Sequence, residues 1–369
     1  MTDVIWKARS PLRMDFVGMT DQHHFSRRSG GSVVNAAIGP YLEATLVPRS
    51  DGRVTITAHD LGRSLAAKTA NSLSARGPLA LLGSVVRQFA DDLRDGVDIA
   101  TYCPLPGGSG LGSSSAVSAC LIALLAAYCG HRLGPTQTAE RAIAAERDAN
   151  RSWYGWQDQY GPVTGGGIKF LHWPRGGKQG PAVESISLSQ AAAADLESNL
   201  LLCDTGVRRQ ARSILDKVSA AIAAGDDGVI SALREMNGLA VRLRDALRAE
   251  RMHALPALLD AVWSAHCRLH PSVTSHRIER LISRAREHGA LGARVCGAGG
   301  GGALMLYCDH GAAGRVREAL ASLGAGAIDY RIVPCGLQIW RAAPRPGDWR
   351  EICTRGPRGR RSGPARRRR

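Results

Sequence analysis

The chain has 369 residues, of which 44% are hydrophobic and 22% charged, and its formal net charge is +16. This length is sufficient for two domains, and the apolar content excludes a largely disordered protein. The positive charge alone suggests nucleic-acid binding, but only 5% of the residues are the aromatic ones on which bases stack. Half of the charge lies in residues 355–369, which hold eight arginines and no acidic residue. We therefore expect a disordered Arg-rich tail at 346–369 and no specific nucleic-acid partner.

The predicted elements of the first half are strands followed by helices. Strands are expected at 5–18, 41–48 and 53–59. The turn residues 50–52 join the last two strands and predict a hairpin. Helical periodicity follows at 117–128 and 136–150.

A loop of glycine and hydroxyl residues precedes the first of these helices. It consists of Pro106, Gly107, Gly108, Ser109, Gly110, Leu111, Gly112, Ser113, Ser114 and Ser115. Its glycines admit close approach of a ligand, and the free N–H groups at a helix start attract anions, so we predict a phosphate site. The spacing imitates a P-loop but lacks the lysine that a P-loop needs. A flexible surface turn is the alternative interpretation.

The second half is expected to be helical before strands return. Helices are expected at 209–224, 228–250, 254–269, 276–288 and 314–323, and strands at 294–297, 303–308 and 328–333. The glycine cluster at 297–302 fits the dinucleotide pattern G-x-G-x-x-G, but that pattern opens a helix, whereas a strand-like run follows here. We therefore expect a strand, a glycine loop and a strand, in which the loop forms a wall without side chains.

The remaining composition favours a cytoplasmic protein. The longest apolar run, 116–128, is shorter than a bilayer span, and the N-terminus lacks the apolar core of a signal peptide. The nine cysteines are odd in number and form no Cys-x-x-Cys. Reduced thiols are therefore expected, with no disulfide framework and no zinc site.

The two glycine loops and residues 9–21 resemble the three ordered motifs of the galactokinase, homoserine kinase, mevalonate kinase and phosphomevalonate kinase superfamily, the GHMP kinases. Shorter segments resemble the D-glycero-D-manno-heptose 7-phosphate kinase branch, and they lie at 26–31, 35–38, 157–160, 204–209 and 336–340. The resemblance covers residues 9–340. It implies an α+β fold of two domains, an N-terminal ribosomal-protein-like domain at 1–195 and a C-terminal ferredoxin-like domain at 196–345.

The resemblance also implies an activity. It indicates an ATP- and Mg²⁺-dependent sugar kinase that phosphorylates a small sugar phosphate, the anomeric hydroxyl of D-glycero-D-manno-heptose 7-phosphate, to give the 1,7-bisphosphate. The alternative is a GHMP kinase that acts on another monosaccharide, such as fucose or galactose, or on a small alcohol. The oligomeric state stays open.

For each position that matches a family motif, the resemblance implies the role that the family's residue has. The first glycine loop would bind ATP, and Ser114 and Glu146 would ligate Mg²⁺. Asp158 would stand beside the acceptor hydroxyl as the candidate base, and Arg13 would hold it ionised and stabilise the transferring phosphoryl group. Without the motifs, Glu146 would be interpreted as a surface acid and Arg13 as part of a structural ion pair.

The substrate site is expected around Asp21, the motif carboxylate that accepts hydrogen bonds from sugar hydroxyls in relatives. The branch usually carries more glycine in front of it, where this chain has Gly18 and Met19. Arg27, Arg28 and Arg209 are expected to hold a distal phosphate of the substrate, because a guanidinium group matches phosphate geometry. The alternative is that they are ordinary surface charges. The expected substrate-binding residues are Thr20, Asp21, Arg27, Arg28, Arg209, Gly297, Gly299 and Gly300.

Overall fold

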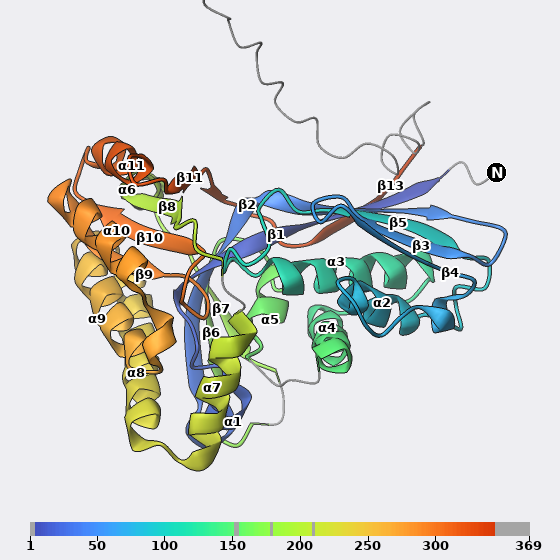
Figure 1. Ribbon diagram of the computed structural model, residues 1–369, viewed down its shortest axis with the longest axis horizontal. Helices are drawn as coiled ribbons and strands as arrows, with labels where there is room; N and C mark the ends of the chain where they lie inside the picture. Colours follow the sequence, from blue (N-terminus) through green and yellow to red (C-terminus); the bar gives the residue numbers. More distant parts are fainter. Residues whose placement is uncertain (1–3, 151–154, 178–179, 209–210, 344–369) are drawn as a thin grey trace, which may run out of the picture.

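The computed structural model describes residues 4–150, 155–177, 180–208 and 211–343. In this part of the chain, nine strands form a large sheet and four form a smaller one, with helices packed against both (Figure 1). Arg209 and the predicted tail at 346–369 lie outside the described residues. No described helix combines the length and the apolar character that crossing a membrane requires.

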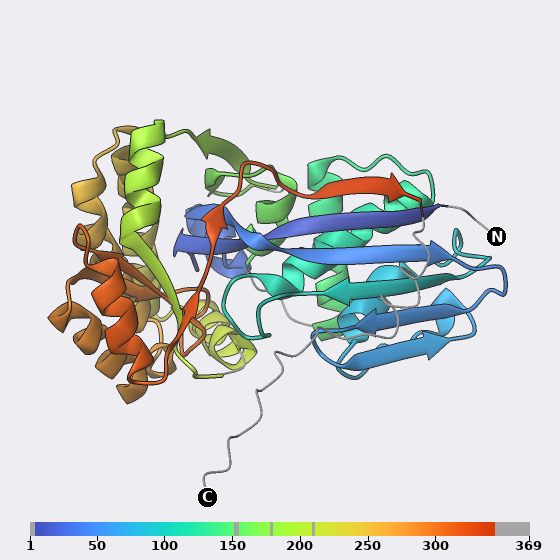
Figure 2. The same cartoon turned by 90° about the horizontal axis from the view of Figure 1, so that it is seen from above.

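The large sheet contains β1 (Ile5–Val17), β2 (Gly31–Pro48), β3 (Val54–Ala58), β4 (Arg63–Ala67), β5 (Val97–Tyr102), β6 (Ile168–Trp173), β7 (Ala182–Ile186), β12 (Arg331–Ile332) and β13 (Gln338–Ala342). Six of them follow the order β13-β1-β2-β5-β3-β4 and lie side by side in Figure 2. The first part of the long strand β2 also pairs with β6, which in turn pairs with β7. β2 therefore extends from this sheet towards the other half of the molecule.

Helices of the first half are α1 (His23–Ser29), α2 (Ala80–Arg87), α3 (Ser113–Tyr128), α4 (Pro135–Asn150) and α5 (Gln157–Val163). α3 packs on β1 and β2, and α2, α4 and α5 pack around it (Figure 1). α3 begins at Ser113, before the predicted start at 117, so the serines of the first glycine loop form the first helical turn. Its apolar residues are buried on nearly every side, because it lies between the sheet and these helices.

The smaller sheet contains β8 (Leu200–Asp204), β9 (Ala290–Val295), β10 (Ala303–Cys308) and β11 (Gly326–Ile328). Its order is β11-β8-β10-β9 with antiparallel neighbours, the arrangement of a ferredoxin-like split β-α-β unit. The helices of this half are α6 (Gln190–Asn199), α7 (Ala211–Ala224), α8 (Asp227–Arg248), α9 (Leu255–Cys267), α10 (His276–Glu287) and α11 (Ala313–Ala321). Single-turn 3₁₀ helices lie at Ala70–Ser72, Met252–Ala254 and Pro271–Val273.

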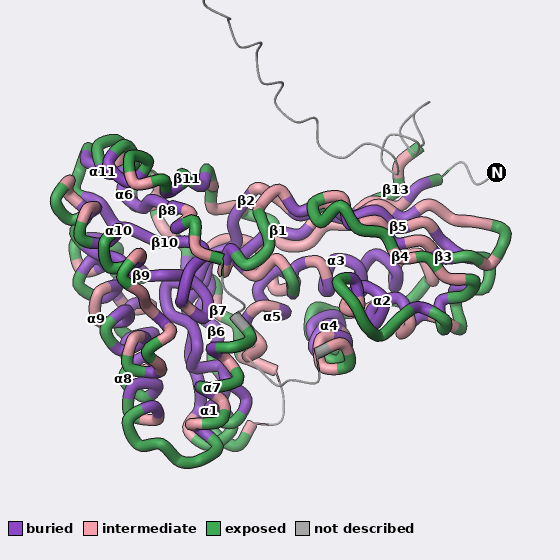
Figure 3. Tube along the Cα trace, viewed as in Figure 1, coloured by how far each residue is buried: buried purple, intermediate pink, exposed green. Residues whose placement is uncertain are grey.

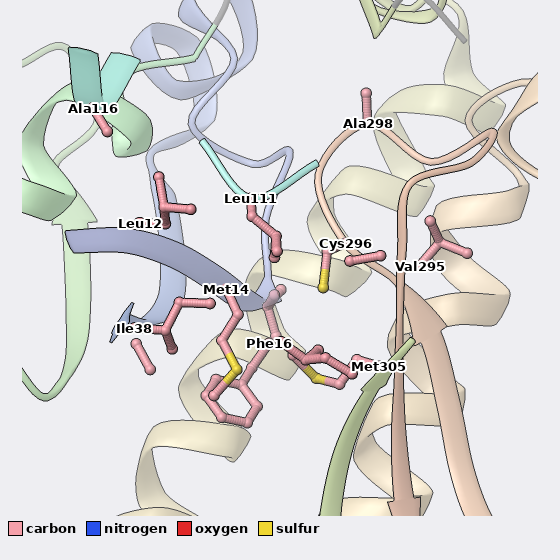
Figure 4. Close-up of a cluster of buried hydrophobic side chains, with 14 of the residues drawn as sticks. Leu12, Met14, Phe16, Ile38, Leu111, Ala116, Val295, Cys296, Ala298 and Met305 are labelled. Carbon is pink, nitrogen blue, oxygen red and sulfur yellow. The ribbon is translucent and has the colours of Figure 1, made fainter. Parts of the chain in front are cut away.

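One hydrophobic core joins the two halves, and Figure 3 shows its buried residues running through β1, β2 and the smaller sheet. At the junction, Met14 and Phe16 of β1 lie with Leu111, Cys296 and Met305 in one cluster (Figure 4). The two glycine loops are therefore anchored to the same strand.

Two strand predictions differ from the fold. The hairpin of 41–48 and 53–59 is wrong, because β5 lies between β2 and β3 and pairs with both. The N–H of Arg49 donates to Gly96 O at 3.1 Å, so the segment leading into β5 fills the space that a tight hairpin would close. The strand expected at 328–333 is divided between β11 and β12, which belong to different sheets.

The predicted boundary at residue 195 falls inside α6, which packs on β8. A boundary between β7 and α6 fits the packing better, and β12 and β13 return to the large sheet. The expected strand, glycine loop and strand are confirmed as β9, 296–302 and β10.

Candidate active site

A cleft of about 630 Å³ lies where the two glycine loops meet α4, α5 and α7. It brings together predicted residues that are far apart in the sequence, among them Arg13, Glu146 and Asp158. The described lining residues are Arg13, Met19, Asp21, Gln22, Gly107, Gly108, Gly110, Gly112, Ser113, Ser114, Ser115, Glu146, Gly155, Gln157, Asp158, Gln159, Arg208, Arg212, Leu215, Gly297 and Ala298.

The first glycine loop presents its backbone to this cleft at the start of α3. Gly110 and Gly112 have φ of +74° and +75°, the left-handed region that favours glycine. Not every residue of the predicted nucleotide loop reaches the cleft. Leu111 is fully buried in the core, Ser109 is buried against the second glycine loop, and Pro106 is exposed outside the lining. The cleft side of the loop is therefore nearly free of side chains up to Ser113.

The two glycine loops pack against each other. The N–H of Ala303 donates to Ser109 O at 2.7 Å. A Cβ on Gly110 would lie 2.8 Å from the carbonyl oxygen of Cys296, and one on Gly297 would lie 3.0 Å from Gly110 O. Such contacts exclude larger residues, so the second loop is a wall without side chains against which the first one closes.

Two predicted substrate-binding glycines do not belong to the cleft. Gly300 donates its N–H to Val273 O at 2.5 Å, and a Cβ on Gly299 would lie 2.7 Å from a Val273 methyl group. Neither is among the described lining residues, whereas Gly297 is. Gly299 and Gly300 are conformationally required for the loop rather than placed to contact a substrate.

Arg13 and Asp158 form a two-bonded ion pair in the cleft. Nε–H of Arg13 donates to Asp158 Oδ1 at 2.7 Å and Nη2–H donates to Oδ2 at 2.8 Å. The Arg13 side chain is 6% exposed and that of Asp158 is 30% exposed. Burial by itself would lower the pKa of Arg13, but the charges of Asp158 and Asp15 outweigh it and the pKa is raised. The guanidinium therefore stays charged beside a carboxylate that opens to the cleft.

A second ion pair, Asp15–Arg294, lies behind Arg13 and was not predicted. Both side chains are 0% exposed, and Arg294 Nη2 lies 2.9 Å from Asp15 Oδ2. Oδ1 of the same carboxylate accepts the N–H of Gly297 at 2.8 Å and lies 3.6 Å from Arg13 Nη1. The available signal was Arg294 within the otherwise apolar strand β9, whereas Asp15 is one of four charged residues in β1 and does not stand out. Since β1 and β9 belong to different sheets, this pair fixes the two halves around the cleft.

Glu146 and two serines supply oxygen atoms beside the start of α3. Ser115 donates to Glu146 Oε1 at 2.6 Å and accepts from Gln159 Nε2 at 3.1 Å, whereas Ser114 is exposed to the cleft. Burial raises the pKa of Glu146 to about 7, and the charge of Asp158 adds to this. A carboxylate and a hydroxyl are donors that suit a hard cation such as Mg²⁺. Ser115, which the sequence assigned to the nucleotide loop but not to the metal site, is the serine that holds the carboxylate.

Asp21 lies at the N-terminal end of α5. Its Oδ2 accepts the N–H groups of Trp156 at 2.6 Å and Gln157 at 2.7 Å. Burial raises its pKa to about 6, and the nearby charge of Asp158 adds to the effect. Met19, two residues earlier, has a φ of +68°, a conformation that favours the glycine usual in the branch. Asp21 therefore holds the N-terminal end of α5, which is the part of this helix that lines the cleft.

Thr20 does not reach the cleft. Its hydroxyl donates to Ser32 O and accepts the N–H of Ser32 at 3.2 Å, and its side chain is fully buried. The prediction that Thr20 binds substrate is therefore wrong. The residue ties the segment before Asp21 to β2.

Asp21→Asn is expected to raise the melting temperature at pH 8. Because the pKa of Asp21 is raised from 3.8 to about 6, the folded protein binds this proton more tightly than the unfolded chain. The charged form therefore reduces stability above pH 6, by at most about 3 kcal/mol, and this loss disappears as the pH falls towards 4. Thermal unfolding of both proteins from pH 4 to pH 8 measures the difference, which should grow with pH. An equal difference at every pH would contradict the raised pKa.

The basic residues at the cleft differ from those expected. Arg27 and Arg28 are exposed on α1 and are not among the described lining residues, so their role at the substrate site stays a prediction that this cavity does not support. Arg208 and Arg212 line the cleft instead. Arg208 Nη1 donates to Asp204 Oδ1 at 2.7 Å, which holds its side chain at the end of β8.

A second, largely apolar pocket of about 240 Å³ adjoins the cleft and was not predicted. Leu79, Leu82 and Val117 line it, and it shares Gly107 and Ser114 with the cleft. The two cavities therefore meet at the first glycine loop.

Comparison with known proteins identifies the family of this chain. Models of the GHMP kinase N-terminal and C-terminal domains match residues 80–166 and 243–326, so both halves of the chain are recognised in the expected order. The chain belongs to the GHMP kinases. The resemblance and the predicted two-domain fold are thereby confirmed, and this GHMP kinase is an ATP-dependent phosphotransferase with an alcohol group as acceptor.

Individual relatives cover almost the whole kinase. D-glycero-alpha-D-manno-heptose 7-phosphate kinase of Campylobacter jejuni is 25% identical over 91% of this chain and 98% of its own length. L-fucokinase/L-fucose-1-P guanylyltransferase of Bacteroides fragilis is 27% identical over 92% of this chain but 39% of its own length. The solved structure of a D-glycero-D-manno-heptose 1-phosphate kinase from Bacteroides thetaiotaomicron aligns with a TM-score of 0.75 at 22% identity, covering 91% of this chain and 98% of that one. This last similarity concerns the fold.

Proposed function

We propose that this kinase transfers the γ-phosphoryl group of ATP to the anomeric hydroxyl of D-glycero-D-manno-heptose 7-phosphate and forms the 1,7-bisphosphate. The observation that carries the proposal is the meeting of a glycine-framed helix start, the Arg13–Asp158 pair and the side chains of Arg208 and Arg212 in one cleft. The name of the Campylobacter jejuni relative supports this acceptor. That of the Bacteroides fragilis relative supports the alternative of an unphosphorylated monosaccharide such as fucose.

The nucleotide is proposed to lie along the first glycine loop. The free N–H groups at the start of α3 and the positive end of its dipole favour the phosphates there. Gly110 and Gly112 leave the backbone accessible to them. The adjoining apolar pocket of about 240 Å³ suits the base, which needs a concave, mostly apolar site.

Ser114 and Glu146 are proposed to hold Mg²⁺. When bound, the ion would neutralise charge on the nucleotide phosphates. Ser115 fixes the Glu146 carboxylate by donating to Oε1 at 2.6 Å. Among the described residues no group of three or more histidines, cysteines or acidic residues is placed to hold a metal. Two protein ligands therefore leave the other positions to phosphate and water, as is usual for Mg²⁺.

Asp158 is proposed to accept the proton of the acceptor hydroxyl. Its two bonds to Arg13 keep the carboxylate aligned, while its 30% exposure leaves it accessible from the cleft. Arg13 would also stabilise the negative charge of the transferring group, since it is held charged beneath the first glycine loop. The Asp15–Arg294 pair keeps Arg13 from shifting away.

The substrate preference gives a direct test. With Mg²⁺ and ATP, heptose 7-phosphate is expected to give a higher kcat/KM than the free heptose, fucose, galactose, mevalonate or homoserine, measured by ADP release and product mass. Arg208→Ala and Arg212→Ala should each raise KM for the sugar phosphate about ten- to a hundredfold, because each removes a charged hydrogen-bond donor. Arg27→Ala and Arg28→Ala are the matched controls on α1 and should leave KM unchanged.

Preference for an unphosphorylated acceptor would overturn the sugar-phosphate assignment and favour the alternative. A rise in KM for the α1 variants, with none for Arg208→Ala or Arg212→Ala, would restore the arginines first expected from the sequence.

A further inference from the structure

Lys169 is a buried lysine of β6 that the activity described so far does not use. Its side chain is 0% exposed, and Nζ donates to the carbonyl oxygens of Gly161 at 2.5 Å and Gly165 at 2.6 Å. No ion pair of Lys169 is found among the residues that the structure describes. Burial lowers its pKa to about 8, so the ammonium form persists at neutral pH. Burying a charge that only carbonyl groups contact costs free energy of folding. A structural or functional role for Lys169 would explain why this cost is accepted.

These carbonyl groups belong to the C-terminal end of α5 and the turn that follows it. Tyr160 O accepts from the N–H of Thr164 at 3.1 Å, and Pro162 O accepts from the N–H of Leu337 at 2.9 Å. Gly161 O is taken by Lys169. The last carbonyls of a helix carry its negative partial charge, so a cation at this end is favourable.

The opposite end of α5 carries the opposite charge. Asp21, 2% exposed, accepts the N–H groups of Trp156 and Gln157. The N-cap residue Trp156 makes no side-chain cap, and at the C-terminal end the Thr164 hydroxyl donates to Tyr160 O at 2.7 Å, which leaves Gly161 O to Lys169. A helix of 7 residues with Pro162 inside it has few internal hydrogen bonds. Its ends are therefore held in part by two buried groups from outside the helix, Asp21 from the segment before α1 and Lys169 from β6, in addition to its packing on α3 and α4.

The first turn of this helix carries Asp158, which lines the cleft, while Lys169 is not among the described lining residues. We propose that Lys169 is a positioning residue, which clamps the C-terminal end of α5 opposite the Asp21 cap and so holds Asp158 against Arg13. The inference rests on the proposed role of Asp158. It assigns to Lys169 an effect on turnover that involves no contact with either substrate.

Hydrogen exchange tests the clamp without any substrate. In Lys169→Met, which removes the donors and keeps much of the volume, the amides of residues 157–161 and 163 are expected to exchange at least about tenfold faster than in wild type. Lys68→Met, an exposed lysine after β4, is the matched control and should leave them unchanged. Lys169→Gln, which replaces the ammonium group by a shorter, uncharged amide with two N–H donors, is measured in the same way if the methionine variant does not fold. Unchanged exchange in the folded variant would overturn the clamp, whichever sugar proves to be the substrate.

Kinetics test the link to Asp158. With the best acceptor of the panel, Lys169→Met should lower kcat about tenfold and change KM for ATP less, because Lys169 bonds to the C-terminal end of α5, whereas Gln159, which bonds to Ser115 of the nucleotide loop, lies in the first turn. In an Asp158→Asn background the same change should lower kcat by less than about twofold, since residues that act as a unit are not additive. Losses that multiply in the double variant would show a role independent of Asp158 and overturn the assignment, even where the sugar preference is as proposed.

Discussion

Asp158→Asn is expected to lower kcat at least about a hundredfold, the lower range for loss of a general base. The amide cannot take a proton from the acceptor hydroxyl, and it can accept only one of the two bonds that Arg13 now donates to the carboxylate. Asp158 is not part of the first glycine loop or of the apolar pocket beside it, so KM for ATP should change little.

Turnover and ATP affinity are measured on Asp158→Asn and on Asp91→Asn, an exposed control carboxylate away from the cleft. The control is expected to behave as wild type. Turnover of Asp158→Asn close to wild type would remove the base role and leave Asp158 as the partner that positions Arg13.

Gly112→Val is expected to abolish detectable ATP binding. Gly112 precedes α3 with φ of +75°, which a β-branched residue adopts only with strain, and a Cβ there would lie 3.1 Å from Cγ of Arg13. The side chain would also occupy the space above the helix start that the phosphates are proposed to fill. Titration calorimetry with ATP on the folded variant measures the loss.

Gly107 supplies the control for this loop. It lines the cleft, its φ is outside the left-handed region, and a Cβ on it meets no atom within 4 Å. Gly107→Ala should therefore keep ATP affinity near that of wild type. Normal affinity in folded Gly112→Val would contradict the placement of the phosphates at this loop.

Local runs of sequence predicted much of this molecule. The first glycine loop, the strand-loop-strand around 296–302 that joins β9 to β10, and most helices could be found because their signals lie within about a dozen neighbouring residues. The assignment of Arg13, Glu146 and Asp158 to one site came from the family resemblance, and the structure brings all three to the same cleft.

The predictions that failed concern residues whose contacts are with segments distant in the sequence. The hairpin after β2 could not be excluded, because nothing near residues 50–52 reveals that β5 will lie between β2 and β3. Thr20 looked like a substrate residue from its position beside Asp21, but its hydroxyl is used by Ser32. Lys169 and Arg294 are ordinary charges in the sequence and acquire their roles only once β6 and β9 place them beside α5 and β1.

The most direct test of the proposed activity is ³¹P NMR of D-glycero-D-manno-heptose 7-phosphate incubated with the enzyme, Mg²⁺ and ATP. The expected result is a second sugar phosphate signal coupled to the anomeric proton, rising as ADP forms, while the 7-phosphate signal is retained. This product requires a cleft that holds ATP at the first glycine loop and the sugar hydroxyl beside Asp158. ADP formation only with an unphosphorylated acceptor, or a new phosphate at a position other than the anomeric carbon, would contradict it.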